Sequence, residues 1–496
     1  MPHDTHLRAS RRFLARSGIN SALRLLAVLP LCSFGQAAEV IDLGTRRELF
    51  VDRYLIDRME GTRLKLHEPQ PAGVVVKFDR PWEGAHVGYA TVIKDGEMYR
   101  LYYRGLPQSG RDGTEDECTC YAESRDGINW QKPDLRLFEV HGTRDNNVIL
   151  HGQAPASHNF SPFLDTRSGV PAEEKFKALA GTEASGLLVF ASADGIHWRK
   201  LQEKPVITKG AFDSQNVGFW SANEGCYVCY FRTWTGGGYR GFRTISRTTS
   251  KDFRNWTEPV SMEFGDTPME HLYTSQTHPY FRAPHLYVAT PMRFVPDRQV
   301  LTDAQARALG VAASYHSDCA DALFMTSRGG NRYDRTFMEA WIRPGTDLGN
   351  WASRAGLTAL GIVPTGPSEM SIYKQAHYAQ PSAHLVRYTL RTDGFVSVNA
   401  PYAGGELVTK PCRFSGQELE INFATSAAGS VRVEIQDESG KAIPGFSMSD
   451  TTELIGDDIE RVVRWRGGPE LRKLAGQPVR LRFVMKDADL YALLFR

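Results

Sequence analysis

The sequence predicts an all-β protein, made of a five-bladed β-propeller followed by a β-sandwich. Two observations predict the propeller: a short turn sequence recurs along the first two thirds of the chain, and β-rich hairpins precede its copies. Units of three or four strands that end in the same turn and repeat every ~60–70 residues are typical of propeller blades. The third observation is a run of alternating strands without this turn after about Val386, which predicts the sandwich.

The repeated turn has the frame Ser-x-Asp-Gly-x-x-Trp. Its copies are ESRDGINW (123–130), ASADGIHW (191–198), TSKDFRNW (249–256) and a degraded TSRGGNRY (326–333). We expect the Asp side chain to accept hydrogen bonds from the next backbone N–H groups, and the Gly to take a positive φ. The Trp then folds back onto the turn. Asp126 and Asp194 are therefore predicted to stabilise the fold rather than to catalyse.

Five units are predicted between these turns. They open at 78–92, 158–165, 212–220, 266–281 and 313–328. The first contains Asp95-Gly96, a strong signal for a hairpin turn. The segment 49–55 (LFVDRYL) is expected to latch the first blade as a strand. The clearest helical signal is 301–309 (LTDAQARAL), with Thr302 as N-cap.

Residues 1–38 are predicted to be an export signal, residues 39–385 the propeller and residues 386–496 the sandwich. The signal combines five arginines, the apolar run 25–31 and small residues before position 39. Twin-arginine and Sec export stay open. Either route predicts a secreted or periplasmic protein. No later segment approaches the ~18 continuous apolar residues of a membrane span.

The net charge argues against a nucleic-acid partner. Residues 1–37 carry five Arg and one Asp, a net +4, so the whole-chain value of +2 becomes about −2 once they are removed. Six cysteines follow the signal: Cys118, Cys120, Cys226, Cys229, Cys319 and Cys412. Residues three apart in a strand point to opposite faces, which disfavours a metal site at Cys226 and Cys229. Buried thiols or one or two disulfides are expected, and no cofactor, although a structural Ca²⁺ stays open.

The repeated turns and the following sandwich resemble the five-bladed propeller glycoside hydrolases of families 32, 43 and 68 and the related mannoside phosphorylases. The domain order is most similar to family 32. The resemblance implies a hydrolase of glycosidic bonds with a carbohydrate as its partner. The chain lacks the Trp-Met-Asn-Asp-Pro-Asn-Gly, Arg-Asp-Pro and Glu-Cys motifs of that family, which argues against cleavage of fructosides.

Glycosidic cleavage needs one carboxyl group that protonates the leaving oxygen and a second that attacks or activates water. Acidic residues where blades open are candidates, because innermost strands line the central funnel. We expect Glu270, Asp213 and Glu83 to be catalytic. Glu270 leads because the polar run EHLYTSQTHP (270–279) would make a poor core strand. The expected substrate-binding residues are Trp82, His158, Asp165, Asn216, Tyr273, Gln276, His278 and Asp318.

Three arginines suggest an alternative substrate, an anionic sugar. Arg104, Arg232 and Arg282 each follow two aromatic residues. If they converge, their planar guanidinium groups would bind a carboxylate, as in sialidases, and the substrate would be an anionic sugar. If they do not, each arginine ends a strand at the surface. A phosphorylase and a non-catalytic carbohydrate-binding propeller also stay open.

Overall fold

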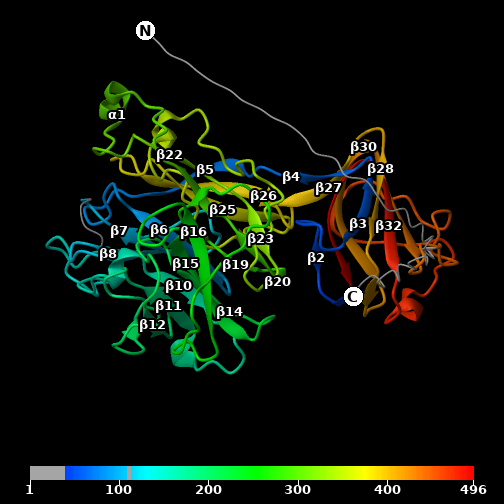
Figure 1. Ribbon diagram of the computed structural model, residues 1–496, viewed down its shortest axis with the longest axis horizontal. Coiled ribbons are helices and arrows are strands. Elements are labelled where there is room, and N and C mark those ends of the chain that lie inside the picture. The colour runs from blue at the N-terminus through cyan, green and yellow to red at the C-terminus, as the bar shows by residue number, and fades with distance from the viewer. Residues whose placement is uncertain (1–39, 109–112) are drawn as a thin grey trace, which may run out of the picture. The chain divides into compact units, whose positions relative to one another are not determined.

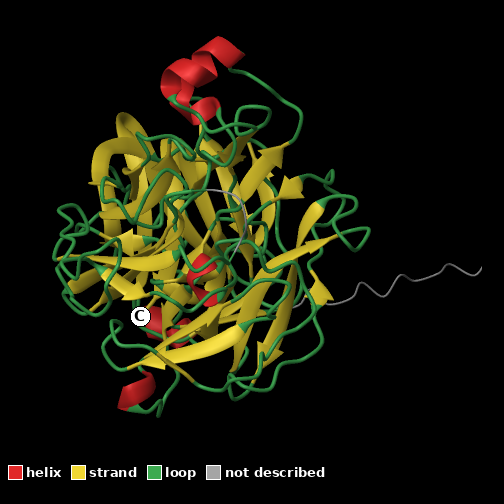
Figure 2. Cartoon of the chain, turned by 90° about the vertical axis from the view of Figure 1, so that its left-hand side faces the viewer, coloured by secondary structure: helices red, strands yellow, loops and turns green. Residues whose placement is uncertain are grey.

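The computed structural model describes residues 40–108 and 113–496, and the predicted export signal lies outside them. This part of the chain is almost entirely β-structure, which confirms the all-β prediction (Figure 1). Figure 2 shows how few helical turns interrupt the strands. The one α-helix among the described residues is α1 (Asp303–Leu309), with Thr302 as its N-cap as predicted. Short 3₁₀ turns lie at η1 (Ala156–His158), η2 (Ala172–Glu174), η3 (Leu348–Trp351) and η4 (Leu471–Leu474).

Three four-stranded antiparallel sheets follow one another along the chain, each with its strands in sequence order. The first contains β6 (Gly88–Asp95), β7 (Met98–Gly105), β8 (Cys118–Ser124) and β9 (Val148–Leu150). The second contains β10 (Ser161–Leu164), β11 (Phe176–Ala180), β12 (Leu188–Ser192) and β13 (Arg199–Lys200). The third contains β14 (Val217–Ser221), β15 (Cys226–Trp234), β16 (Arg243–Ser250) and β17 (Val260–Ser261).

The next strands form two three-stranded sheets. One contains β18 (His271–Leu272), β21 (Met292–Val295) and β22 (Cys319–Ala322), and the other contains β19 (His278–Tyr280), β20 (Ala283–Ala289) and β23 (Met325–Ser327). The segment 313–328 therefore completes this group, whereas the sequence predicted that it opens a fifth unit. The repeat spacing of the sequence predicted a fifth unit here because the strands of the fourth hairpin are divided between two sheets.

The last sheet of this series is closed by a strand from the other end of the chain. It contains β24 (Val363–Pro364), β25 (Glu369–Ala376), β26 (His384–Arg391) and β5 (Gln70–Lys77), and β5 pairs antiparallel with β26. The segment predicted to latch the first blade, 49–55, lies elsewhere, because Glu48 and Leu49 pair with Leu493 and Ala492. The N-terminal strand that completes this sheet is β5 instead.

The first strands of successive sheets meet around a common axis. Strand β6 contacts β10, β10 contacts β14, and β14 contacts β19. The segment before β24 returns to β6, because the backbone N–H of Val92 donates to Leu360 O at 2.7 Å. Buried glutamines link this ring: Gln276 Nε2 donates to Gln215 Oε1 and to Thr358 O, both at 2.7 Å. The described sheets are therefore arranged as in a propeller.

The remaining strands form an eight-stranded sheet with a small parallel pair beside it. The strands of the sheet are β2 (Glu48–Leu49), β3 (Ile56–Glu60), β4 (Arg63–Leu66), β27 (Val396–Ala400), β28 (Gly405–Thr409), β30 (Leu419–Gln436), β31 (Asp457–Val462) and β32 (Arg480–Phe495). The parallel pair is β1 (Ile41–Gly44) with β29 (Cys412–Phe414). This sheet therefore combines both ends of the described chain. The strand at 386–391, predicted to begin the sandwich, pairs instead with β25 and β5.

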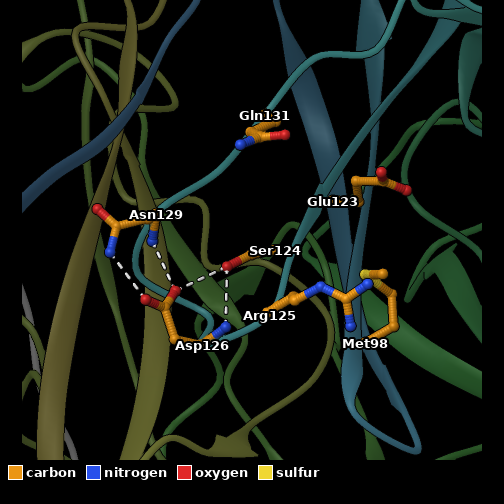
Figure 3. A pocket seen from close by; sticks show the side chains of 7 residues that line it. All are labelled: Met98, Glu123, Ser124, Arg125, Asp126, Asn129 and Gln131. Carbon is orange, nitrogen blue, oxygen red and sulfur yellow. Dashed lines mark hydrogen bonds between the residues drawn. The ribbon is translucent and has the colours of Figure 1, made fainter.

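The repeated turns have the predicted hydrogen bonds. Asp126 Oδ1 accepts from the backbone N–H groups of Ile128 and Asn129 at 2.8 Å, and Trp130 Nε1 donates to Gly127 O at 3.2 Å. Figure 3 shows Asp126 between Ser124 and Asn129 beside a cavity of about 350 Å³. Several hydrogen bonds lower the pKa of Asp126, and the one from the backbone N–H of Asn129 has the largest effect. The turns at Asp194 and Asp252 repeat this pattern.

Each of these turns also packs against a neighbouring sheet. Tyr373 Oη, on β25, donates to Gly127 O at 2.5 Å. A Cβ placed on Gly195 would lie 2.5 Å from Tyr102 Oη, on β7. In the third turn Phe253 takes the glycine's position at a φ of 67°, and its ring packs 5.6 Å from that of Phe163 on β10. The turns therefore hold adjacent sheets together as well as closing hairpins.

The six cysteines of the described residues are free thiols, and all are buried. Cys118 and Cys120 are the nearest to each other, with 3.7 Å between their sulfur atoms. Burial raises the pKa of the Cys229 and Cys412 thiols. The prediction of buried thiols is confirmed for these positions, and no disulfide joins them.

Candidate functional site

Residues just before the innermost strands meet at one end of the ring. His158 lies three residues before β10, and Asp213 lies four before β14. Tyr89, at the start of β6, donates its hydroxyl to Asp213 O at 2.9 Å and lies 3.3 Å from the hydroxyl of Tyr273. Arg354, before β24, donates to Tyr273 Oη at 3.3 Å. Residues at or near the starts of inner strands from every part of the ring therefore contribute to one cluster.

Tyr273 is at the centre of this cluster and is 5% exposed. The guanidinium carbons of Arg232, Arg354 and Arg243 lie 4.9, 5.3 and 5.8 Å from its ring centroid. Burial would raise the pKa of Tyr273, but the positive charges of Arg354 and Arg232 and the hydrogen bonds from Tyr89 and Arg354 outweigh it and lower the pKa to about 7. The pKa of Tyr89 is raised, chiefly by burial. The cations around Tyr273 therefore favour its ionised form.

Asp213 brings a carboxylate to the cluster. Its side chain forms an ion pair with Arg232, and it is 23% exposed, whereas the Arg232 side chain is 2% exposed. Its backbone carbonyl also faces His158 Nε2 at 3.2 Å. His158 Nδ1 lies 2.9 Å from Glu117 Oε1, and both of these side chains are buried. Asp213 is therefore held in place through its backbone while its carboxylate borders solvent.

Asp318 is the second carboxyl group at the cluster. Burial raises its pKa, and a hydrogen bond with Ser353 and the nearby charges of Arg354 and Arg243 only partly offset this. Its Oδ1 atom is buried and has no hydrogen-bond partner among the described residues. Asp318 is therefore protonated more readily than an exposed Asp, and it interacts with two of the arginines that surround Tyr273.

Arg104 joins the cluster on the side of Tyr89 and His158. Its guanidinium carbon lies 4.6 Å from the centroid of the Tyr89 ring, and Nη2 donates to His86 O at 2.9 Å and to Tyr378 Oη at 3.2 Å. Of the three arginines predicted to converge, the structure brings Arg104 and Arg232 to the cluster. Arg282 lies elsewhere, because it bridges to Glu460 at 2.6 Å and Asp393 at 3.4 Å.

Two of the predicted catalytic carboxylates have structural partners. Glu270 bonds to Arg293 at 3.0 Å and to Arg335 at 2.5 Å, so its charge is balanced. Glu83 is fully buried, and it accepts from Tyr103 Oη at 2.5 Å and from Lys132 Nζ at 2.8 Å. Neither residue contacts the Tyr273 cluster. Their contacts explain why polar residues were needed at these positions.

Several predicted substrate-binding residues lie within the framework. Trp82 Nε1 donates to Asn147 at 2.9 Å. Asp165 pairs with Lys177 at 2.7 Å and Tyr227 Oη at 2.6 Å. Asn216 donates to the Phe212 and Ser214 carbonyls at 3.0 Å.

Gln276 and His278 lie along the axis rather than in the cluster. Gln276 belongs to the axial glutamine pair described above. His278 Nε2 accepts from the Ile362 N–H at 3.1 Å, and burial lowers the pKa of His278 to about 4. His278 borders a cavity of about 680 Å³ lined by the inner-strand segments of several sheets.

Sequence reasoning missed four members of the cluster: Tyr89, Glu117, Arg243 and Arg354. Tyr89 was hidden in an apolar strand segment, and its φ of 53° places the ring away from the strand's regular alternation. Arg354 has a φ of 60° and lies in a loop without periodicity. Arg243 follows a glycine-rich loop whose sequence is typical of an exposed surface loop. Among the described residues, no group of three or more His, Cys, Asp or Glu side chains is arranged to hold a metal ion.

No helix within 40–108 and 113–496 combines the length and the apolar character that a membrane span requires. No family model matches the chain. No curated protein matches it either.

The chain is similar to several solved structures. One is named a glycoside hydrolase and has 12% identity, a TM-score of 0.44 and coverage of 65% of this chain and 92% of its own. An N-acetylgalactosamine deacetylase from F. plautii, in complex with blood group B trisaccharide, has 13% identity, a TM-score of 0.42 and coverage of 67% and 96%. A fructofuranosidase from Schwanniomyces occidentalis has 9% identity, a TM-score of 0.38 and coverage of 86% and 98%.

Proposed function

We propose that this protein is a glycoside hydrolase whose catalytic carboxyl groups are Asp213 and Asp318. The observation that supports this best is that both residues border one group of arginines around Tyr273, at the end of the ring where the inner strands begin. Glycosidic cleavage uses two carboxyl groups in opposite roles, set by their environments. In this arrangement Asp318 is the acid, and Asp213, beside Arg232, is the carboxylate.

The proposed reaction assigns a task to each group. Asp318 protonates the glycosidic oxygen as the bond to the anomeric carbon breaks. Asp213 either attacks that carbon or removes a proton from the attacking water. The hydroxyls of Tyr273 and Tyr89, which lie next to each other and to Asp213, hydrogen-bond to sugar hydroxyls. Arg104 and His158 contact the ring of Tyr89 and complete the site there.

The proposal includes the architecture around the site. The three four-stranded sheets, the split fourth group and the sheet closed by β5 are proposed to be five blades. The sheet that contains β30 and β32 is proposed to be a sandwich built from residues 41–66 and 396–495. Residues 1–38 are proposed to direct export, so that the enzyme meets its carbohydrate outside the cytoplasm.

The test is release of reducing sugar from a panel of neutral, uronic, sulfated and sialylated glycans. We expect Asp213→Asn and Asp318→Asn each to lower turnover by ~100-fold or more, since each removes one proton-transfer or nucleophilic group. Asp134→Asn, at an exposed carboxylate, is the matched control. Glu270→Gln tests the rival assignment, and loss of turnover equal to that of Asp213→Asn would return catalysis to Glu270. Glycan binding without cleavage by the wild-type chain would make the protein a carbohydrate-binding propeller instead.

A further inference from the structure

The arginines of the Tyr273 cluster differ in their ion pairing within the part of the chain that the structure describes. Arg232 is paired with Asp213, but neither Arg243 nor Arg354 has a carboxylate oxygen within 4.0 Å in the part of the chain that the structure describes. The polar side-chain partners of Arg354 are the hydroxyls of Tyr273 and Ser353, each at 3.3 Å. Most other half-buried arginines here have an acidic partner, as Arg293 has Asp321 at 2.6 Å. The two unpaired cations therefore require an explanation.

Arg243 is held in place by aromatic rings rather than by an ion pair. Its guanidinium carbon lies 4.5 Å from the ring centroids of both Trp234 and Phe294. Its Nε atom is buried and has no hydrogen-bond partner among the described residues. A buried donor without an acceptor is destabilising, and more so when it is charged. Arg243 is thus held between two aromatic rings, with a buried donor that no described residue satisfies.

We propose that Arg243 and Arg354 bind the anionic group, a carboxylate or a sulfate, of the sugar that this site accepts. The inference rests on the proposed function, because it names the substrate class of the same site. The guanidinium carbons of these two arginines lie 5.8 and 5.3 Å from the ring centroid of Tyr273. Burial, and then the charges of Arg232 and Arg354, lower the pKa of Arg243, so the cations of the cluster act on one another. Guanidinium groups suit this task because their donors lie in a plane that matches two oxygens of one anion.

This pair differs from the triad that the sequence suggested. Arg282 is engaged by Glu460 and Asp393 away from the cluster. Arg232 already bonds to Asp213, so it positions the proposed catalytic carboxylate. The anion site is therefore made by residues from two other segments: the start of β16 and the loop before β24.

Trp234, whose ring contacts Arg243, also lines a cavity. Its volume is about 380 Å³, and Trp234, Tyr239, Lys209 and Glu183 are among the residues that line it. The ring of Trp234 contacts Arg243 on one side and lies 5.7 Å from the ring of Tyr239 on the other. Exposed aromatic faces with polar neighbours suit sugar rings. Trp234 therefore borders both Arg243 and the cavity.

The experiment measures monosaccharide binding, because a monosaccharide has no glycosidic bond to cleave and its binding is independent of hydrolysis. Ligand-observed NMR with glucuronic acid, galactose 6-sulfate and glucose separates carboxylate from sulfate and both from a neutral sugar. We expect at least one anionic sugar to bind ten-fold or more tightly than glucose, and added salt to weaken it. The anion that binds more tightly identifies the group that the substrate carries.

Arg243→Gln is expected to reduce binding of that anion ten-fold or more, with glucose binding unchanged. Arg240→Gln is the matched control, because Arg240 is exposed, lies three residues away and forms no ion pair with any described residue. Equal affinity of all three sugars, or an equal loss in both variants, would overturn the proposal. If anions bind as expected while Asp213→Asn and Asp318→Asn keep full glycan turnover, the catalytic assignment fails and the anion site stands.

Discussion

Replacement of Phe253 tests whether the repeated turn demands a left-handed residue. In the first two turns this position is Gly127 or Gly195, at φ of 72° and 76°, whereas Phe253 takes the same conformation at 67°. A side chain there costs about 1–2 kcal/mol. Phe253 is fully buried, and its ring packs 5.1 Å from Tyr227 and 5.6 Å from Phe163. Loss of a buried Phe side chain costs about 3–5 kcal/mol.

These two terms predict an unusual order of stability. Phe253→Ala loses the ring and keeps the strained φ, so we expect its free energy of unfolding to fall by about 3–5 kcal/mol. Phe253→Gly loses the ring but removes the strain, so it is expected to be about 1 kcal/mol more stable than the Ala variant. At an ordinary strand position Gly is the less stable of the two by about 0.5–1 kcal/mol.

The assay is urea unfolding followed by tryptophan fluorescence, since the ring of Trp256 lies 5.7 Å from that of Phe253 and reports on this turn. A Phe253→Ala variant that is more stable than Phe253→Gly would refute the argument. Gly127→Ala provides the converse case. A Cβ there would meet Tyr373 Oη and Thr365 Cγ2, both at 2.9 Å, and destabilisation of about 1–3 kcal/mol is expected.

Two further predictions concern ionisable groups. Asp194→Ala removes the acceptor for the backbone N–H groups of Ile196 and His197, both within 2.9 Å. In urea titrations it should lower the unfolding free energy by about 1 kcal/mol, with glycan affinity unchanged. Unaltered stability would contradict the claim that Asp194 stabilises the turn. Tyrosinate absorbance at 295 nm should rise with a midpoint near pH 7 in the wild type and not in Tyr273→Phe, because the arginines lower the pKa of Tyr273 to about 7. Since this folded-state pKa is below the ordinary value of 10, the ionised form adds stability that is complete above pH 10 and is lost as the pH falls through 7. The same titration in the Tyr273→Phe variant would show that Tyr273 is not the group that titrates near pH 7.

The parts of the fold that the sequence predicted depend on local chemistry. The Asp turns, the capped helix at Thr302 and the Asp95-Gly96 hairpin each follow from residues a few positions apart, and the structure confirms them. Long-range pairing was not readable in this way. Strand β26 alternates like the strands after it, so nothing local distinguishes pairing with β5 from membership of the C-terminal sheet.

The site shows the same division. Asp213, Tyr273 and Asp318 were predicted because they lie near the openings of units, and Arg232 because it follows two aromatic residues. The structure brings all four to one cluster. Glu270 had the same sequence context, but Arg293 and Arg335 come from 23 and 65 positions away to neutralise it. Whether a carboxylate is free for chemistry depends on such distant partners, which the local pattern does not contain.

The pairing of β5 with β26 has a consequence for the order of events during synthesis. Residues 70–77 leave the ribosome more than 300 residues before their partner strand at 384–391, and residues 41–66 wait longer still for β27, β28 and β32. Until then both early segments expose unpaired strand edges, which favour aggregation. The strand around Val74 is therefore a segment that a chaperone would need to protect. A chain that stops before residue 384 would lack the partner of β5, and its ring would stay open.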